Sequence, residues 1–179
     1  MEIDLPLVDK QIELLKAGDL VHLNGWIYTA RDAAHKRMME DKLQGNILPF
    51  DVERQTIYYA GPAPTPPGKV IGSIGPTTSS RMDPFTTFML NQGVKGFIGK
   101  GPRSTEIRRA LQQHGAVYFA AIGGAAALQA RSIIKMETIA YEDLGAEAIR
   151  RLYVSGMAVY VANDCYGGSI FPEEYDYKE

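Results

Sequence analysis

Short apolar runs, rich in β-branched and aromatic residues, alternate along this chain with longer stretches of helix-forming composition. The predicted strands are Leu20–Thr29, Thr56–Ala60, Val70–Ile74, Gly96–Ile98, Ala116–Ile122 and Ala158–Ala162. The predicted helices are Asp32–Leu43, Pro84–Gln92, Thr105–His114, Ala125–Ser132 and Asp143–Arg150, each bounded by Gly, Pro, Asp or Ser. This alternation indicates a layered α/β domain and argues against a β-sandwich or a helical bundle.

Two features indicate antiparallel as well as parallel pairing. The segment Tyr58–Pro62 leads through a proline-rich loop back into Val70–Ile74, an arrangement that fits a wide hairpin. Farther on, Ser155-Gly156 separates Arg150–Val154 from Met157–Val161, and this pair is typical of a tight antiparallel turn. We therefore expect a mixed sheet with flanking helices.

Length and charge narrow the class of protein. A chain of 179 residues can bury one hydrophobic core, so we expect residues 1–179 to form a single domain. The formal net charge of −2 argues against nucleic-acid or membrane-surface binding, which requires a basic excess. No basic segment precedes an apolar run at the start, and no apolar run reaches the roughly 20 residues of a membrane span. We expect a cytoplasmic protein with a frayed polar end at residues 172–179.

Cysteine content restricts the metal chemistry. The single cysteine, Cys165, excludes an internal disulfide and cannot supply the three or four thiolates that usually hold an iron–sulfur cluster. The histidines, His22, His35 and His114, lack the close spacing of a zinc site. We interpret Cys165 as a packed or turn thiol, because no paired histidine is apparent. Any metal would therefore be held largely by another chain.

The first candidate site lies in Tyr28–Lys36, where the strand Leu20–Tyr28 ends and a helix begins. Asp32 suits the N-terminal cap of that helix and its positive dipole end. His35 follows Arg31 by one helical turn, so the two can share a face. The alternative is a simple cap followed by a solvated basic face.

The second candidate site is Gly75–Asp83, written GPTTSSRMD, which follows one predicted strand and precedes the helix that starts with Pro84. A strand-to-helix turn presents free N–H groups and a partial positive charge, which suit an anion. Arg81 would add a planar, two-bond grip on a carboxylate or phosphate. The alternative is an elaborate helix cap, which explains four hydroxyls and an arginine poorly.

Two further turns follow predicted strands. In Ile98–Ser104, glycines flank Lys100 and allow close approach to a ligand, without the spacing of a phosphate-binding loop. The small residues of Ile122–Ala127 are better explained by close helix–strand packing. Because open α/β sheets bind ligands at strand ends, two arginines and a lysine there suggest a small, doubly anionic substrate.

Three motifs together, TARDAAHKR (Thr29–Arg37), YYAGP (Tyr58–Pro62) and GPTTSSRMD, carry a resemblance to a known family. From about Leu5 to Phe171 the chain resembles the β-subunit, or C-terminal domain, of class I iron–sulfur fumarases and L-tartrate dehydratases. The resemblance implies a swivelling β/β/α-type domain that closes over an α-subunit, in an α2β2-type assembly. Three cysteines of that α-subunit would hold a 4Fe–4S cluster.

The resemblance also implies roles for individual residues. Thr77 would be the catalytic base at carbon, and Ser80 departs from the family motif, which has glycine before the arginine. The implied substrate-binding residues are Arg31, Arg81 and Lys100, and the implied supporting residues are Asp32, His35 and Asp83.

The activity implied is reversible hydration and dehydration of a small dicarboxylate, which proceeds only with the cluster-bearing α-subunit. Fumarate and (S)-malate are the favoured pair, and L-tartrate is the alternative substrate. A different class of function is a stand-alone anion-binding domain without catalytic activity.

Overall fold

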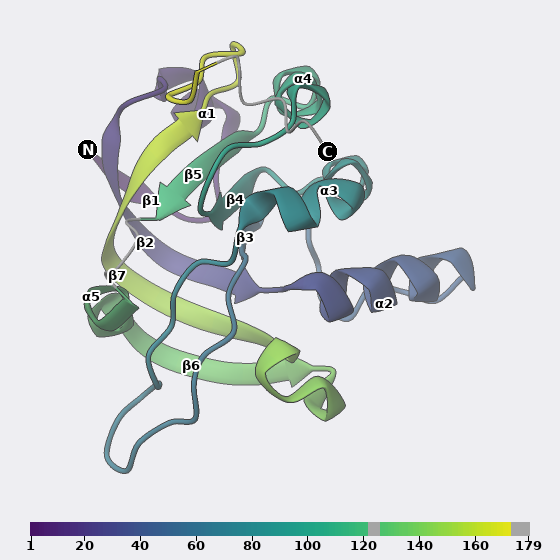
Figure 1. The fold of residues 1–179 in the computed structure, drawn as a ribbon, viewed down its shortest axis with the longest axis vertical. Coiled ribbons are helices and arrows are strands. Elements are labelled where there is room, and N and C mark those ends of the chain that lie inside the picture. The colour runs from purple at the N-terminus through teal and green to yellow at the C-terminus, as the bar shows by residue number, and fades with distance from the viewer. Residues whose placement is uncertain (122–125, 173–179) are drawn as a thin grey trace.

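The computed structural model describes residues 1–121 and 126–172 (Figure 1). The strands are β1 (Glu2–Asp4), β2 (Leu20–Thr29), β3 (Thr56–Tyr58), β4 (Gly96–Gly99), β5 (Val117–Ala121), β6 (Ile133–Ala140) and β7 (Ile149–Asn163). The α-helices are α1 (Asp9–Leu14), α2 (Asp32–Leu43), α3 (Asp83–Asn91), α4 (Thr105–Gln113) and α5 (Ala126–Ser132), and two 3-10 helices are η1 (Ser79–Met82) and η2 (Glu142–Glu147). None of the described helices is long and apolar enough to cross a membrane.

The described strands form one mixed sheet that closes on itself. Strands β2, β3, β4 and β5 are parallel neighbours, and β7 runs antiparallel to both β5 and β2, which completes a five-stranded barrel-like ring. Strand β1 extends the sheet beside β2, and β6 pairs antiparallel with β7. The prediction of an α/β domain with a mixed sheet and flanking helices is confirmed.

The core has two parts, one on each face of the sheet. Val21, Leu23 and Ile27 alternate along β2 and belong to the cluster that fills the ring. On the opposite face, α3, α4 and the first part of α2 pack against the sheet and bury residues such as Met38 and Leu111, whereas the rest of α2 projects outward (Figure 1). Each fully buried side chain of this size stabilises the fold by about 1.5–3 kcal/mol, so the helices are held firmly against the strands.

The predicted hairpin at Ser155-Gly156 is wrong, because β7 is a single continuous strand through this point. The first half of β7 lies between β2 and β6, and the second half lies between β2 and β5. Gly156 has a φ of 65°, and its N–H donates to the Asn24 side chain at 2.8 Å. A serine–glycine pair therefore bends the strand as a bulge where its partner changes.

The predicted strand Val70–Ile74 is also wrong, because this segment lies in a long loop. Only the ends of the loop approach one another, through a bridge between Ala60 and Pro76 and a bond from the Ala63 N–H to the Ser73 carbonyl at 2.9 Å. The prolines of the loop cannot donate ladder hydrogen bonds, and this explains the absence of a regular strand among these described residues.

The predicted helix Asp143–Arg150 is replaced by η2 followed by the start of β7. Gly145, with φ 60° and ψ −116°, interrupts helical geometry, and Ile149 then begins the strand. Elements β1, α1 and β6 were not predicted. Most of the expected frayed end and the centre of the small-residue turn after β5 lie outside the described residues.

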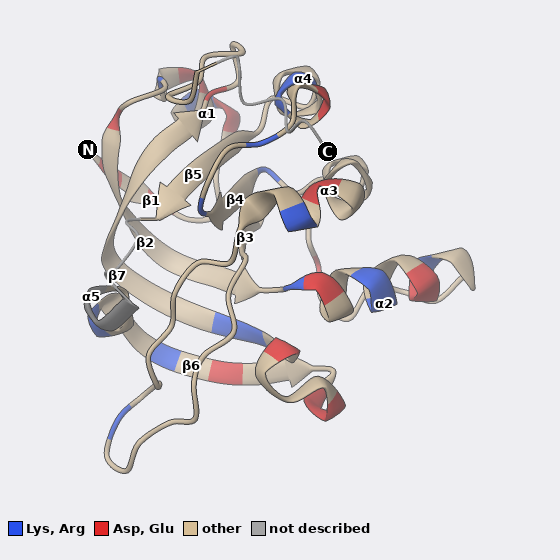
Figure 2. Ribbon diagram, viewed as in Figure 1, with Lys and Arg blue, Asp and Glu red and all other residues tan. Residues whose placement is uncertain are grey.

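The parallel strands bring three predicted site segments to one end of the ring. Arg31 follows the carboxyl end of β2, the loop to Thr77 follows β3, and Lys100 follows β4. Figure 2 shows charged residues of both signs at the starts of α2 and α3, which begin at this end. The fold therefore gathers the candidate residues where parallel sheets bind ligands.

Candidate active site

The backbone brings Thr77 beside Lys100. The Lys100 N–H donates to the Thr77 carbonyl at 3.3 Å, and the Ser79 N–H donates to the Lys100 carbonyl at 2.9 Å. A short parallel bridge joins Thr78 to Lys100. The GPTTSSRMD turn thus continues the sheet as an extra extended segment beside the end of β4.

Close packing behind this turn requires a glycine. A Cβ on Gly99 would collide with the hydroxyl oxygen of Ser79. That hydroxyl is buried and lies 2.8 Å from the Tyr118 hydroxyl, which donates to the Gly101 carbonyl at 2.8 Å. Ser79 therefore serves the structure of the turn, which leaves the other hydroxyls of the motif available for a ligand.

The elaborate-cap alternative does not explain those other hydroxyls. Thr78 is the N-cap residue of η1, yet its side chain makes no capping hydrogen bond. The N-cap residue of α3 is Met82, and it likewise makes no side-chain cap. The side chains of Thr77, Thr78 and Ser80 are partly buried, and none of them caps the start of η1 or α3.

Arg81 and Asp32 form an ion pair that connects two of the predicted segments. The Arg81 Nη2 lies 2.9 Å from the Asp32 Oδ2, and the side chains are 52% and 33% exposed. Asp32 is the first residue of α2, and Arg31 is the N-cap residue, so the prediction of Asp32 as the cap is wrong. The Asp32 carboxylate instead turns toward Arg81 while still favouring the positive end of the α2 dipole.

Arg31 lies between the end of β2 and two other segments. Its Nε is 3.3 Å from the Glu147 Oε1, which η2 contributes. A Cβ on Gly61 would lie 2.6 Å from the Ala146 carbonyl oxygen and 3.5 Å from the Arg31 Cδ. Glycine at position 61 thus lets the loop after β3 pack directly against η2 and Arg31.

His35 supports Arg31 from inside the protein. The side chain is buried against Phe85 and Tyr59, and its Nδ1–H donates to the Arg31 carbonyl at 2.8 Å. Burial lowers the pKa of His35 to about 4, with a smaller lowering contribution from the Arg103 charge and opposing contributions from the Arg31 carbonyl and Asp32. His35 is therefore neutral near pH 7, and the alternative of a solvated basic face is wrong for this residue.

Asp83 is fixed by a buried arginine that the sequence interpretation did not single out. The Arg103 side chain is 0% exposed, and its Nε donates to the Asp83 Oδ1 at 2.6 Å. The other guanidinium nitrogens donate to the Tyr59 hydroxyl at 3.3 Å and to the Thr86 hydroxyl. The Ser104 N–H adds a bond to Asp83 at 3.1 Å. Arg103 thereby joins the loops after β3 and β4 to the start of α3.

The spacing of residues in the sequence does not predict that Arg103 pairs with Asp83. The available signal was local: Asp83-Pro84 and Arg103-Ser104 each stand directly before or at a helix start.

Cys165 lies at the opposite end of the ring from these residues. It occupies a turn after β7, whose last residue, Asn163, pairs with Tyr118 at the beginning of β5. Its Sγ is 3.8 Å from the Ile12 carbonyl oxygen, and burial raises the pKa of the thiol. The interpretation as a turn thiol is confirmed. This single thiol, distant from the candidate site, does not fit the donor set of an iron–sulfur cluster.

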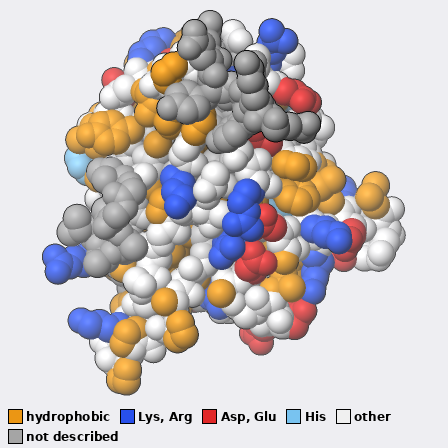
Figure 3. Space-filling model, viewed as in Figure 1, with side chains coloured by type: hydrophobic (Ala, Val, Ile, Leu, Met, Phe, Trp, Pro, Cys, Tyr) orange, Lys and Arg blue, Asp and Glu red, His pale blue; other side chains and the backbone are white. Residues whose placement is uncertain are grey.

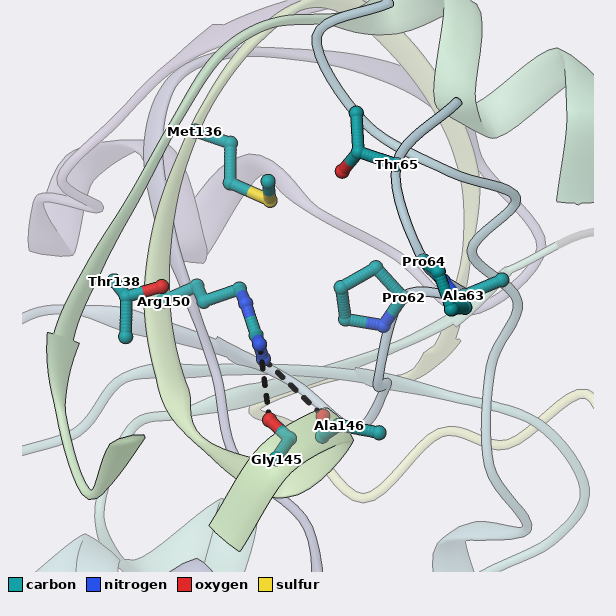
Figure 4. Close-up of a pocket in the computed structure, with 9 residues that line it drawn as sticks. All are labelled: Pro62, Ala63, Pro64, Thr65, Met136, Thr138, Gly145, Ala146 and Arg150. Atoms are coloured by element: carbon teal, nitrogen blue, oxygen red, sulfur yellow. Dashed lines mark hydrogen bonds between the residues drawn. The ribbon is translucent and has the colours of Figure 1, made fainter. Parts of the chain in front are cut away.

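A cavity of about 340 Å³ adjoins η2 and the loop after β3 (Figure 4). It is lined by Pro62, Ala63, Pro64, Thr65, Met136, Thr138, Gly145, Ala146 and Arg150. The Arg150 guanidinium donates to the carbonyls of Gly145 and Ala146, at 2.9 and 3.3 Å. The charge of Arg150 is therefore directed at the η2 backbone, whereas the predicted arginines lie outside this cavity.

The surface above the strand ends combines both signs of charge. Figure 3 shows Lys or Arg and Asp or Glu side chains side by side on the face that carries the starts of α2 and α3. The contacts above link Lys100 to Thr77 and Arg81 to Asp32, which directly follows Arg31. Together they define an α/β domain in which basic, acidic and hydroxyl-bearing residues gather at the ends of the parallel strands.

The family model described as Fumarase C-terminus matches residues 1–174, and the chain belongs to this family. The predicted resemblance is thus confirmed. Over 173 residues the chain is 40% identical to a Methanocaldococcus jannaschii protein provisionally named L(+)-tartrate dehydratase subunit beta, covering 93% of this chain and 89% of that protein.

Two longer relatives are fumarate hydratases. The chain is 40% identical over 153 residues to the mitochondrial fumarate hydratase 1 of Leishmania major. It is 39% identical over 153 residues to the aerobic class I fumarate hydratase of Escherichia coli strain K12. Each alignment covers 84% of this chain but only 28% of the relative, so the chain spans less than a third of these enzymes.

Proposed function

We propose that this chain is the β-subunit of a hydro-lyase that adds water to, or removes it from, a small dicarboxylate, with fumarate and (S)-malate as the favoured pair. The observation that carries the proposal is that a backbone hydrogen bond places Lys100 beside Thr77 and an ion pair places Arg81 beside Asp32, both at the strand ends. Membership of the fumarase family supports the same reaction class.

In this proposal Arg31 and Arg81 bind the two carboxylates of the substrate. A guanidinium matches a carboxylate with two parallel hydrogen bonds, which fix orientation as well as charge. The Arg81 side chain is half exposed, and an exposed ion pair contributes only about 0–1 kcal/mol, so exchanging Asp32 for substrate costs little. Lys100, exposed beside the turn, adds a third positive charge.

Thr77 is the proposed base that takes the proton from carbon. A carbon next to a carboxylate is a very weak acid, so the base must be strong and closely placed. A threonine hydroxyl meets this need only where its alkoxide is stabilised by nearby cations and oriented N–H groups. The backbone pairing of Thr77 with Lys100, and the position of Arg81 four residues farther along the same turn, support such a setting.

The 4Fe–4S cluster is proposed to belong to a partner α-subunit, in an α2β2-type assembly. This chain has one cysteine, at the other end of the ring, and so cannot hold the cluster itself. Closure of this domain on that partner would exclude water and bring the base and the carboxylate-binding groups onto the substrate together.

L-Tartrate is the second candidate substrate, and one observation favours it. The Methanocaldococcus jannaschii relative, of which the alignment covers 89%, is named for tartrate dehydratase. Ser80, placed directly before Arg81 in the turn, is a position where the two substrates could be distinguished, because its Cβ restricts the approach of the backbone.

The test is co-expression of this chain with the cluster-bearing subunit, anaerobic reconstitution, and assay on malate, fumarate and both tartrates. Turnover of malate and fumarate above the tartrates supports the first assignment, and the reverse order supports the second. Succinate binding by this chain alone, with turnover of none of the four by the assembled pair, would establish a stand-alone anion-binding domain instead.

A further inference from the structure

Glu147 approaches Arg31 without forming a hydrogen bond. The Arg31 Nε lies 3.3 Å from the Glu147 Oε1, and the two side chains are 27% and 24% exposed. The Nε is buried and has no hydrogen-bond partner. Within residues 1–121 and 126–172, the terminal nitrogens of Arg31 make no hydrogen bond either. The Glu147 carboxylate thus attracts the Arg31 guanidinium at its Nε, and the two terminal nitrogens of Arg31 can donate hydrogen bonds to a ligand.

The segment that carries Glu147 is anchored on both sides. The Arg150 guanidinium donates to the carbonyls of Gly145 and Ala146 (Figure 4). It also donates to the Ala148 carbonyl, so its partners lie on both sides of Glu147 in the sequence. The Thr29 hydroxyl, at the end of β2, donates to the Ala148 carbonyl at 3.4 Å and accepts the Arg150 N–H at 3.0 Å. Glu147 is therefore placed by the same strand end that places Arg31.

Helix α2 is fastened to η2 as well. Arg37 donates two hydrogen bonds to Asp143, at 2.7 and 2.8 Å. The Tyr141 hydroxyl, directly before η2, donates to Asp41 at 2.6 Å. These links join α2 and η2 at two further points beyond the Arg31–Glu147 contact, and so help to fix the position of Glu147 relative to Arg31.

We propose that Glu147 is a positioning residue of the dicarboxylate site, which holds the guanidinium of Arg31 in the orientation that binds a substrate carboxylate. This inference rests on the proposed function. A long, freely rotating arginine loses side-chain entropy when a ligand orders it, and a fixed neighbouring carboxylate removes part of that cost beforehand. The competing role for Glu147 is a simple repulsive charge, which would weaken dicarboxylate binding without affecting orientation.

The experiment compares Glu147→Gln with the matched control Glu142→Gln in the assembled, cluster-loaded complex. Glu142 is an exposed residue of the same 3-10 helix and forms no ion pair with a described residue. We expect Glu147→Gln to lower kcat/KM for the preferred substrate about 10- to 30-fold, and Glu142→Gln to change it less than about twofold. Glu147→Asp keeps the negative charge, so its kcat/KM should fall less than that of Glu147→Gln. If the glutamine variant does not assemble, the aspartate variant is compared with the control instead.

A double-mutant cycle separates positioning from a general structural effect. In an Arg31→Lys background, Glu147→Gln should change kcat/KM by less than about twofold, because lysine has no Nε to orient. An equal loss in both backgrounds would overturn the proposal. So would tighter succinate binding with unchanged kcat, which is the signature of a repulsive charge, or a Glu147→Gln variant that matches the control.

Succinate, a dicarboxylate that cannot be hydrated, distinguishes this inference from the proposed function. Calorimetric titration of the four members of the cycle should show weaker binding in Glu147→Gln and no further weakening in the Arg31→Lys background. That pattern in a complex without turnover would leave Glu147 as a positioning residue of an anion site and reject the hydro-lyase. A wild-type complex that does not bind succinate would overturn the inference.

Discussion

Replacing Arg103 by methionine tests how the candidate site is held together. The variant removes a fully buried guanidinium that binds Asp83, Tyr59 and Thr86, and methionine fills much of the vacated volume. Removing one partner of a buried ion pair costs about 3–5 kcal/mol, because the other charge is left uncompensated. The Asp83 side chain is 16% exposed, so water recovers part of this cost, and we expect a loss of about 3 kcal/mol.

The assay is urea unfolding of the purified chain at pH 7.5, followed by circular dichroism. With an m value of about 2–3 kcal/mol per M, this loss lowers the midpoint by about 1–1.5 M. Adding Asp83→Asn to Arg103→Met should restore about 1–2 kcal/mol, because the stranded carboxylate is then neutral. A loss below about 1 kcal/mol, or a double variant that loses the sum of both single losses, would refute this account of the site.

Three further predictions concern pH, the arginines and the metal. His35 has a pKa of about 4 when folded and an ordinary value of 6.5 when unfolded, so the unfolded state takes up a proton first as pH falls through this window. The free energy of unfolding should therefore fall by about 2 kcal/mol more between pH 7.5 and 5.0 in the wild type than in His35→Asn; equal slopes in urea titrations would contradict this. Arg31→Lys and Arg81→Lys should each weaken kcat/KM of the assembled enzyme by about 2–4 kcal/mol, and losses below about 1 kcal/mol at both would make them surface charges. The chain purified alone should bind no iron–sulfur cluster and show no hydratase activity; stoichiometric iron and sulfide, or turnover, would reject the need for a partner.

Sequence patterns correctly predicted the helices and strands whose bounds depend on neighbouring residues in the sequence. Strand Leu20–Thr29 and helix Asp32–Leu43 have the predicted bounds, because alternating burial in the first and clear punctuation around the second mark their ends. Val70–Ile74 has the same β-branched composition but lies in a loop, since strand propensity does not specify a partner. Closure of the ring by β7 against β2 joins distant parts of the chain, and no local signal reports it.

The candidate site likewise contains residues that the sequence could predict and contacts that it could not. Arg31, Arg81 and Lys100 were predicted from motifs that follow predicted strands, and the role of Thr77 was implied by the family resemblance. All four roles remain predictions. The contacts of Arg103 with Asp83 and of Glu147 with Arg31 depend on which loops meet in three dimensions. The sequence around Arg103 and Glu147 resembles ordinary turns.

Turnover by Thr77→Val in the assembled, cluster-loaded enzyme tests most directly whether Thr77 is the base that takes the proton from carbon. Valine keeps the shape of threonine and removes the hydroxyl, so kcat on malate should fall by about a thousandfold or more while KM stays within a few-fold. Thr78→Val, one residue farther along the same turn, should lower kcat much less. A Thr77→Val enzyme that retains more than about a tenth of the wild-type kcat would show that Thr77 is not the base.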